Sequence, residues 1–161
     1  MKAVMYKMLR DDDGKNSLVK ESSCYVPSVD SVNNETNVET LLNCLFSADK
    51  LAEEHMWMLA VNTKMKVIGI FEVAHGQVNG CMISPREIFI RALMIGATYI
   101  LLAHNHPSGI PTPSQEDERI TQRVAEAGKL IGIPLIDHVI IGDGRTYSFY
   151  GNDNKALARA K

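Results

Sequence analysis

The tetrapeptide His-Asn-His-Pro at residues 104–107 constrains this chain more than any other feature of its sequence. It follows residues 99–103, a uniformly apolar run typical of a buried strand, and Pro107 and Gly109 end that strand. Histidines two positions apart on a strand point to the same side of a sheet. The sequence therefore predicts a core strand that presents two imidazoles on one face where it reaches the surface.

Ser114 and Asp117, further along the chain, complete a metal-ligand pattern. Ser114 and Asp117 follow His106 by eight and eleven residues. Three side-chain ligands leave a fourth position of Zn²⁺ open to water, as in catalytic sites, whereas structural zinc is closed by a fourth side chain. We therefore predict that His104, His106 and Asp117 bind a catalytic Zn²⁺. The alternatives are two satisfied core histidines and a helix-capping box at Ser114-x-x-Asp117, and the capping box is compatible with a ligand role.

Composition limits the class of protein. The 161 residues, 45% hydrophobic and 22% charged, suit one globular domain, and we expect a soluble protein because no signal peptide or apolar run of transmembrane length is present. The three cysteines are far apart and include no Cys-x-x-Cys, so a reducing cytoplasm is the expected location. The net charge of −2, without a Lys/Arg block, argues against a nucleic-acid partner.

Alternating apolar patterns and turn residues divide the chain into strands and helices. We expect strands at 3–10, 17–26, 55–61, 66–74, 80–83, 99–103, 135–141 and 145–149, and helices at 36–49, 85–95 and 114–131. The first two strands form a hairpin, and the pattern Thr36-x-x-Glu39 predicts the first helix cap. This order predicts an α/β sandwich with about three helices. We divide it into an N-terminal extension (1–35), a metal-binding domain (36–150) and a C-terminal tail (151–161).

The metal-ligand pattern resembles a known family. His-x-His-Pro with the later Ser and Asp looks like the JAMM motif of JAB/MPN zinc metalloproteases. The wording His-Asn-His-Pro-Ser-Gly at 104–109, with Pro-Arg-Glu at 85–87 and Asp-His-Val-Ile at 137–140, resembles the bacterial RadC branch over residues 40–150. The resemblance implies a cytidine-deaminase-like α/β/α sandwich with a mixed sheet, and Zn²⁺ on His104, His106 and Asp117.

The resemblance also implies two catalytic side chains. An upstream glutamate acts as general acid/base, and Glu54 matches it because a hydrophobic strand ending in a polar turn follows, although Glu53 adjoins it. The Ser114 hydroxyl would donate to the developing oxyanion. Amide hydrolysis needs this set: a nucleophilic water, a Lewis acid, a proton shuttle and an oxyanion donor. The chain is thus expected to be a zinc-dependent metallopeptidase or isopeptidase-like amide hydrolase that acts on a peptide or protein.

The alternative is a non-catalytic or DNA-repair-associated accessory protein of the RadC type. Longer relatives carry a helix-hairpin-helix segment, and the first forty residues contain no helix pair of this kind, so we expect no DNA-binding part. A homo-oligomer is compatible with the sequence. The Pro-Cys-x-x-Cys half of the nucleotide-deaminase signature is absent, which disfavours base deamination.

Three further histidines need an interpretation. His138 follows Asp137 on an apolar strand, where a carboxylate could orient an imidazole beside the metal, but we favour a hydrogen-bonded core pair of these two residues. His55 and His75 have no ligand spacing, and we expect them to be surface or core histidines.

Overall fold

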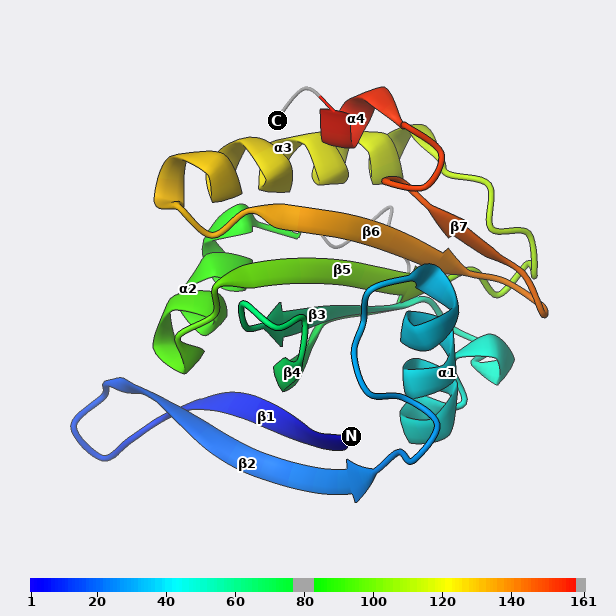
Figure 1. Cartoon of the computed structure of the whole chain (residues 1–161). Coiled ribbons are helices and arrows are strands. Elements are labelled where there is room, and N and C mark those ends of the chain that lie inside the picture. Colours follow the sequence, from blue (N-terminus) through cyan, green and yellow to red (C-terminus); the bar gives the residue numbers. More distant parts are fainter. Residues whose placement is uncertain (77–82, 159–161) are drawn as a thin grey trace.

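The computed structural model describes residues 1–76 and 83–158 and contains one mixed seven-stranded sheet (Figure 1). The strand order is β2-β1-β4-β3-β5-β6-β7, in which β1/β4 and β5/β6 are parallel and the other neighbours are antiparallel. The strands are β1 (Lys2–Arg10), β2 (Asn16–Tyr25), β3 (His55–Val61), β4 (Val67–His75), β5 (Tyr99–Asn105), β6 (Leu135–Ile141) and β7 (Thr146–Ser148). The helices are α1 (Glu35–Phe46), η1 (Ala48–Lys50), α2 (Pro85–Ile95), α3 (Gln115–Ile131) and α4 (Lys155–Ala158).

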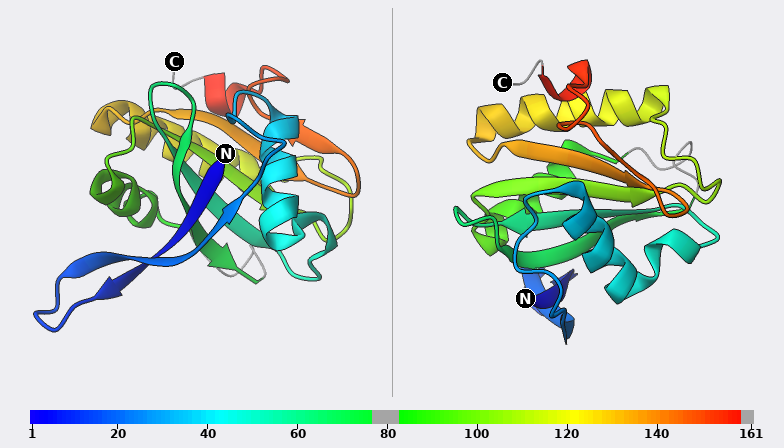
Figure 2. Two further views of the ribbon diagram at one scale, coloured as in Figure 1. Left: turned by 60° about the horizontal axis from the view of Figure 1, so that its bottom comes forward. Right: turned by 45° about the vertical axis from the view of Figure 1, so that its right-hand side comes forward.

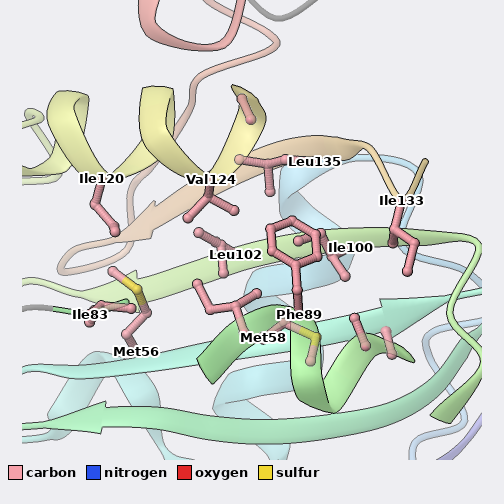
Figure 3. Close-up of a cluster of buried hydrophobic side chains, with 14 of the residues drawn as sticks. Met56, Met58, Ile83, Phe89, Ile100, Leu102, Ile120, Val124, Ile133 and Leu135 are labelled. Carbon is pink, nitrogen blue, oxygen red and sulfur yellow. The ribbon is translucent and has the colours of Figure 1, made fainter. Parts of the chain in front are cut away.

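Helices cover both faces of this sheet (Figure 2). Along β3, Met56, Met58 and Ala60 belong to the core cluster formed with α2 and α3, whereas Trp57 and Leu59 belong to the cluster formed with α1. Figure 3 shows the first cluster between the sheet and its helices. Successive strand residues point to opposite faces, so a continuous apolar run is what a strand covered on both sides requires. The predicted α/β sandwich is confirmed.

The ends of the chain extend this sandwich. The predicted N-terminal hairpin is confirmed: β1 and β2 pair antiparallel, and β1 joins the rest of the sheet through Met5, which pairs with Ile70 of β4. At the other end, Leu157 of α4 is buried in the α2/α3 cluster, so part of the predicted C-terminal tail contributes to the core. Within the described residues, no helix has the length and apolarity to cross a membrane.

Two local predictions need comment. The cap of α1 is Asn34, whose side chain accepts a hydrogen bond from the Asn37 N–H at 2.8 Å, so the predicted cap at Thr36 is wrong. Both residue types suit a cap, and the helix is capped two residues earlier than predicted. The strand predicted at 80–83 falls largely outside the described residues, and Ile83 itself lies in no strand.

Candidate metal centre

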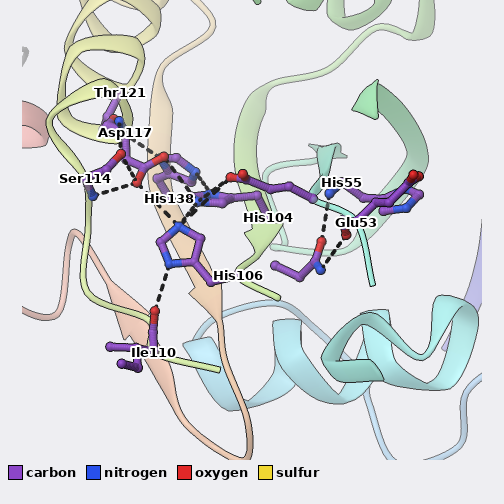
Figure 4. A network of polar contacts seen from close by, with 11 residues as sticks. Glu53, His55, His104, His106, Ile110, Ser114, Asp117, Thr121 and His138 are labelled. Carbon is purple, nitrogen blue, oxygen red and sulfur yellow. Dashed lines mark hydrogen bonds and ion pairs between the residues drawn. The ribbon is translucent and has the colours of Figure 1, made fainter. Parts of the chain in front are cut away.

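The structure brings four predicted site residues together at one end of β5 (Figure 4). Glu54, His104, His106 and Asp117 each offer a ligand atom, and these atoms lie within 4.8 Å of one another. The two histidines are at the end of β5, Asp117 is in the first turn of α3, and Glu54 immediately precedes β3. Residues more than sixty positions apart thus form one cluster.

The distances suit a tetrahedral cation. The Nε2 atoms of His104 and His106 are 3.0 Å apart, and the Asp117 carboxylate lies 3.2 Å from the first (Oδ1) and 3.5 Å from the second (Oδ2). Ligand atoms about 2.0–2.1 Å from Zn²⁺ are separated by about 3.3 Å in a tetrahedral site. Moreover, Asp117 Oδ1 is a buried atom without a hydrogen-bond partner among the described residues. Because such an atom is costly to bury, these residues fit a bound cation.

Glu54 lies beside this ligand set and farther from the histidines than Asp117 does. Its Oε1 is 3.7 Å from His104 Nε2 and 4.0 Å from His106 Nε2. The adjacent Glu53 points elsewhere: its side chain is 64% exposed, and its Oε2 lies 2.5 Å from His75 Nε2. Of the two neighbouring glutamates, Glu54 is therefore the one that faces the centre.

The hydrogen bonds of His106 fix which nitrogen faces the centre. Its Nδ1 lies 2.8 Å from the Ile110 carbonyl oxygen. A carbonyl can only accept, so Nδ1 carries the proton and donates it. In the neutral imidazole, Nε2 then has a lone pair directed at the centre, as a metal ligand requires.

A longer relay sets the same tautomer for His104. The Thr121 hydroxyl donates to the Asp117 backbone carbonyl at 2.5 Å, so it accepts from His138 Nδ1, 2.6 Å away. Burial, then the charge of His104, lowers the pKa of His138 well below its usual value, and its Nε2 is consequently an acceptor. It accepts from His104 Nδ1 at 2.8 Å. His104 Nε2 is therefore unprotonated, and its lone pair faces the lone pair of His106 Nε2. A cation between the two nitrogens would accept both lone pairs.

The predicted Asp137–His138 side-chain pair is wrong. The Asp137 carboxylate accepts from the His138 backbone N–H (2.7 Å), the Ser148 hydroxyl (2.6 Å) and the Tyr150 N–H (2.9 Å). Burial, the largest effect, raises the pKa of Asp137. Neighbouring residues on β6 point to opposite faces, so the two side chains cannot pair. The ring of His138 instead lies fully buried behind His104.

Ser114 is both a helix cap and an anchor for Asp117. Its N–H and its hydroxyl donate to Asp117 Oδ2 at 2.7 and 2.6 Å, and the Asp117 N–H donates to Ser114 Oγ at 3.2 Å. This is the predicted capping box. The single hydroxyl proton of Ser114 is used by Asp117 here, so the serine orients that carboxylate.

The electrostatics of the cluster favour a positive charge. Burial would raise the pKa of Asp117, but the neighbouring imidazoles of His104 and His106, together with the hydrogen bonds from Ser114, hold it well below its usual range. Without a metal, the hydrogen bond to Asp117 raises the pKa of His106. The ionised carboxylate thus attracts either protons or a cation to the two imidazoles.

Asn105 is a site residue that the sequence reasoning missed. It lies between the two predicted ligands, so its side chain points to the other face of the sheet, where it is buried. Its carboxamide accepts from the His55 N–H at 2.8 Å and donates to the Glu53 carbonyl at 3.0 Å. These bonds bracket Glu54 and fix its backbone relative to the histidines. The alternation of His-x-His was the available signal, because it directs the middle side chain to the face opposite the two histidines.

Comparison with known proteins identifies relatives of this chain. The curated relatives include UPF0758 proteins of Caldanaerobacter subterraneus subsp. tengcongensis, 45% identical over 114 residues, and of Moorella thermoacetica, 50% identical over 95 residues. These alignments cover 70% and 59% of this chain, but 49% and 42% of the relatives, so the chain spans about half of their length or less. The model of the RadC-like JAB domain matches residues 32–155, which contain the whole cluster built above. By this match the chain belongs to the RadC-like JAB domain family.

Proposed function

We propose that this chain is a zinc-dependent amide hydrolase, a metallopeptidase or isopeptidase, with His104, His106 and Asp117 as metal ligands. One observation carries the proposal: the buried Asp117 carboxylate, whose Oδ1 has no hydrogen-bond partner among the described residues, lies within 3.5 Å of the Nε2 atoms of His104 and His106, and the Nδ1 atoms of both histidines are committed as donors. A zinc ion held there would supply a Lewis acid for an amide carbonyl and acidify a water molecule. The JAB family, which includes metalloproteases, supports the same reaction class.

Glu54 would move the proton in this reaction. Its carboxylate accepts the proton of the attacking water and returns it to the leaving amine nitrogen. The side chains of Glu54 and His106 are 20% and 15% exposed, whereas those of His104 and Asp117 are essentially buried. A peptide or protein substrate therefore approaches from the side of Glu54 and His106. Ser114 holds Asp117 in the resting site, and its hydroxyl would have to change partners to donate to an oxyanion.

A peptide-library cleavage assay with and without a chelator tests the proposal. Glu54→Gln should lower turnover by about 10²–10⁴-fold, because the shape remains and the base is lost, with zinc content unchanged. The matched control is Glu116→Gln, the same change in an exposed residue that pairs with Arg119 outside the centre, and it should keep full activity. A Glu54→Gln protein with full chelator-sensitive activity would refute the base assignment. A zinc-loaded wild type that cleaves no amide would refute the function.

A further inference from the structure

A second group of metal-ligating side chains lies next to Glu54. Glu53, His55 and His75 each offer one ligand atom, and these atoms lie within 4.8 Å of one another. None of them belongs to the centre described above. Glu53 and His55 immediately flank Glu54, and Figure 4 shows both directed away from the four-residue cluster. We call this group the outer cluster.

The sheet pairs the two histidines of the outer cluster. His55 on β3 is directly opposite His75 on β4, and the rings stack with centroids 4.0 Å apart. Each imidazole also has a carboxylate partner: His55 Nδ1 lies 2.6 Å from Glu72 Oε1, and His75 Nε2 lies 2.5 Å from Glu53 Oε2. Two imidazoles and two carboxylates thus occupy one small patch of surface.

The backbone beneath this patch is tied down. Asn105 bonds the backbone of both Glu53 and His55, and the Gly76 N–H donates to the Glu54 carbonyl at 2.9 Å. Two of the side chains above this backbone are accessible to solvent: those of His75 and Glu53 are 55% and 64% exposed. Side-chain rotation alone can therefore bring the ligand atoms closer together, without movement of the strands.

We propose that the outer cluster binds a second divalent transition-metal ion of the Zn²⁺ class through His55, His75 and Glu53, with Glu72 available as a fourth ligand. Imidazole nitrogen with carboxylate oxygen is the donor set that such ions prefer over Mg²⁺ or Ca²⁺. The ion takes the place of the direct contacts within the two imidazole–carboxylate pairs. Partial exposure makes this site weaker than the buried one, so the outer ion is lost first on dialysis.

Equilibrium dialysis of the full chain against Zn²⁺ at pH 7.5, followed by metal analysis, tests this site. The wild type should take up two equivalents, with the weaker one missing from His75→Ala. The variant His104→Ala/His106→Ala should keep the weaker equivalent and lose the tighter one. The control Glu126→Gln, a change of an exposed carboxylate on α3, should keep both.

Retention of two equivalents by His75→Ala, or one wild-type equivalent that His75→Ala keeps, overturns the outer site. One wild-type equivalent that His75→Ala loses supports the outer site and contradicts the first centre, so the two failures are distinguishable. NMR of the histidine rings adds a second readout. The ring signals of His75, assigned by their absence from the spectrum of His75→Ala, should shift in the wild type as the second equivalent of Zn²⁺ is added. Their constancy would count against the site.

Discussion

Replacing Asn105 with alanine tests whether the hydrogen bonds of Asn105 position Glu54, the proposed general base. The substitution removes the two hydrogen bonds that tether Glu53 and His55, at 3.0 and 2.8 Å. At about 0.5–1.5 kcal/mol each, their loss should lower the free energy of unfolding by about 1–3 kcal/mol. Turnover should fall further than this stability loss explains, because a displacement of about 1 Å at a reacting group costs up to about 10²-fold.

Asn62→Ala is a matched control at the opposite end of β3. The Asn62 side chain likewise makes two backbone hydrogen bonds, accepting both, from the Lys64 N–H at 2.9 Å and the Lys66 N–H at 3.1 Å. Its removal should lower the free energy of unfolding by a similar amount without changing turnover, since this turn is remote from the metal centre. Urea denaturation, zinc analysis and steady-state kinetics on one cleaved peptide measure the three quantities.

Equal losses of turnover in Asn105→Ala and Asn62→Ala would refute the positioning role. A second variant, Asn105→Asp, keeps the size of the side chain and so separates the loss of a hydrogen bond from the loss of packing. Its carboxylate can still accept from the His55 N–H but puts an oxygen against the Glu53 carbonyl. We expect Asn105→Asp to lose turnover as well, while its zinc content remains that of the wild type.

Three further outcomes are expected, two from the site and one from the charge of the chain. The folded-state pKa of His138 is well below the unfolded value near 6.5, so the neutral ring stabilises the fold above that pH and this stabilisation is lost as the pH falls below it. With a chelator present, the free energy of unfolding of the wild type should fall by up to about 1.4 kcal/mol per pH unit more than that of His138→Gln between pH 6.5 and 5. Urea-denaturation profiles of the two proteins that run parallel over this range would contradict this. Ser114→Ala should weaken zinc about 10–100-fold in a chelator competition, because Asp117 loses its anchor; unchanged affinity would assign the serine to capping alone. Generic duplex DNA should bind no tighter than about 10 μM at physiological salt, and submicromolar salt-dependent binding would overturn that expectation.

The sequence predicted the parts of this centre that local rules specify. The spacing of His104 and His106 follows from strand alternation, and the Ser114 cap places Asp117 in the first turn of a helix. Both depend on neighbours in the chain. Glu54, fifty residues upstream, was assigned only through the resemblance to a family, because no local pattern links it to the histidines.

The supporting residues depend on contacts between elements, which the sequence does not specify. His138 on β6 lies opposite Leu102 on β5, so its ring reaches His104 two residues further along the same face, and it meets Thr121 of α3, which packs on that face. Thr121 lies one helical turn after Asp117, which was a usable signal for the shared face. The pairing of His55 with His75 likewise depends on the β3/β4 register, and a chain-spacing rule cannot detect it.

Anomalous diffraction at the zinc absorption edge, from a crystal of the purified protein prepared without added metal, tests most directly the claim that His104, His106 and Asp117 bind Zn²⁺. We predict one strong peak about 2.0–2.1 Å from Nε2 of His104 and of His106 and within bonding distance of Asp117 Oδ1, with Glu54 near the ion as a non-ligand. No peak at these three atoms, or a peak bound through Nδ1 of either histidine, would contradict the account of the metal centre and its tautomers.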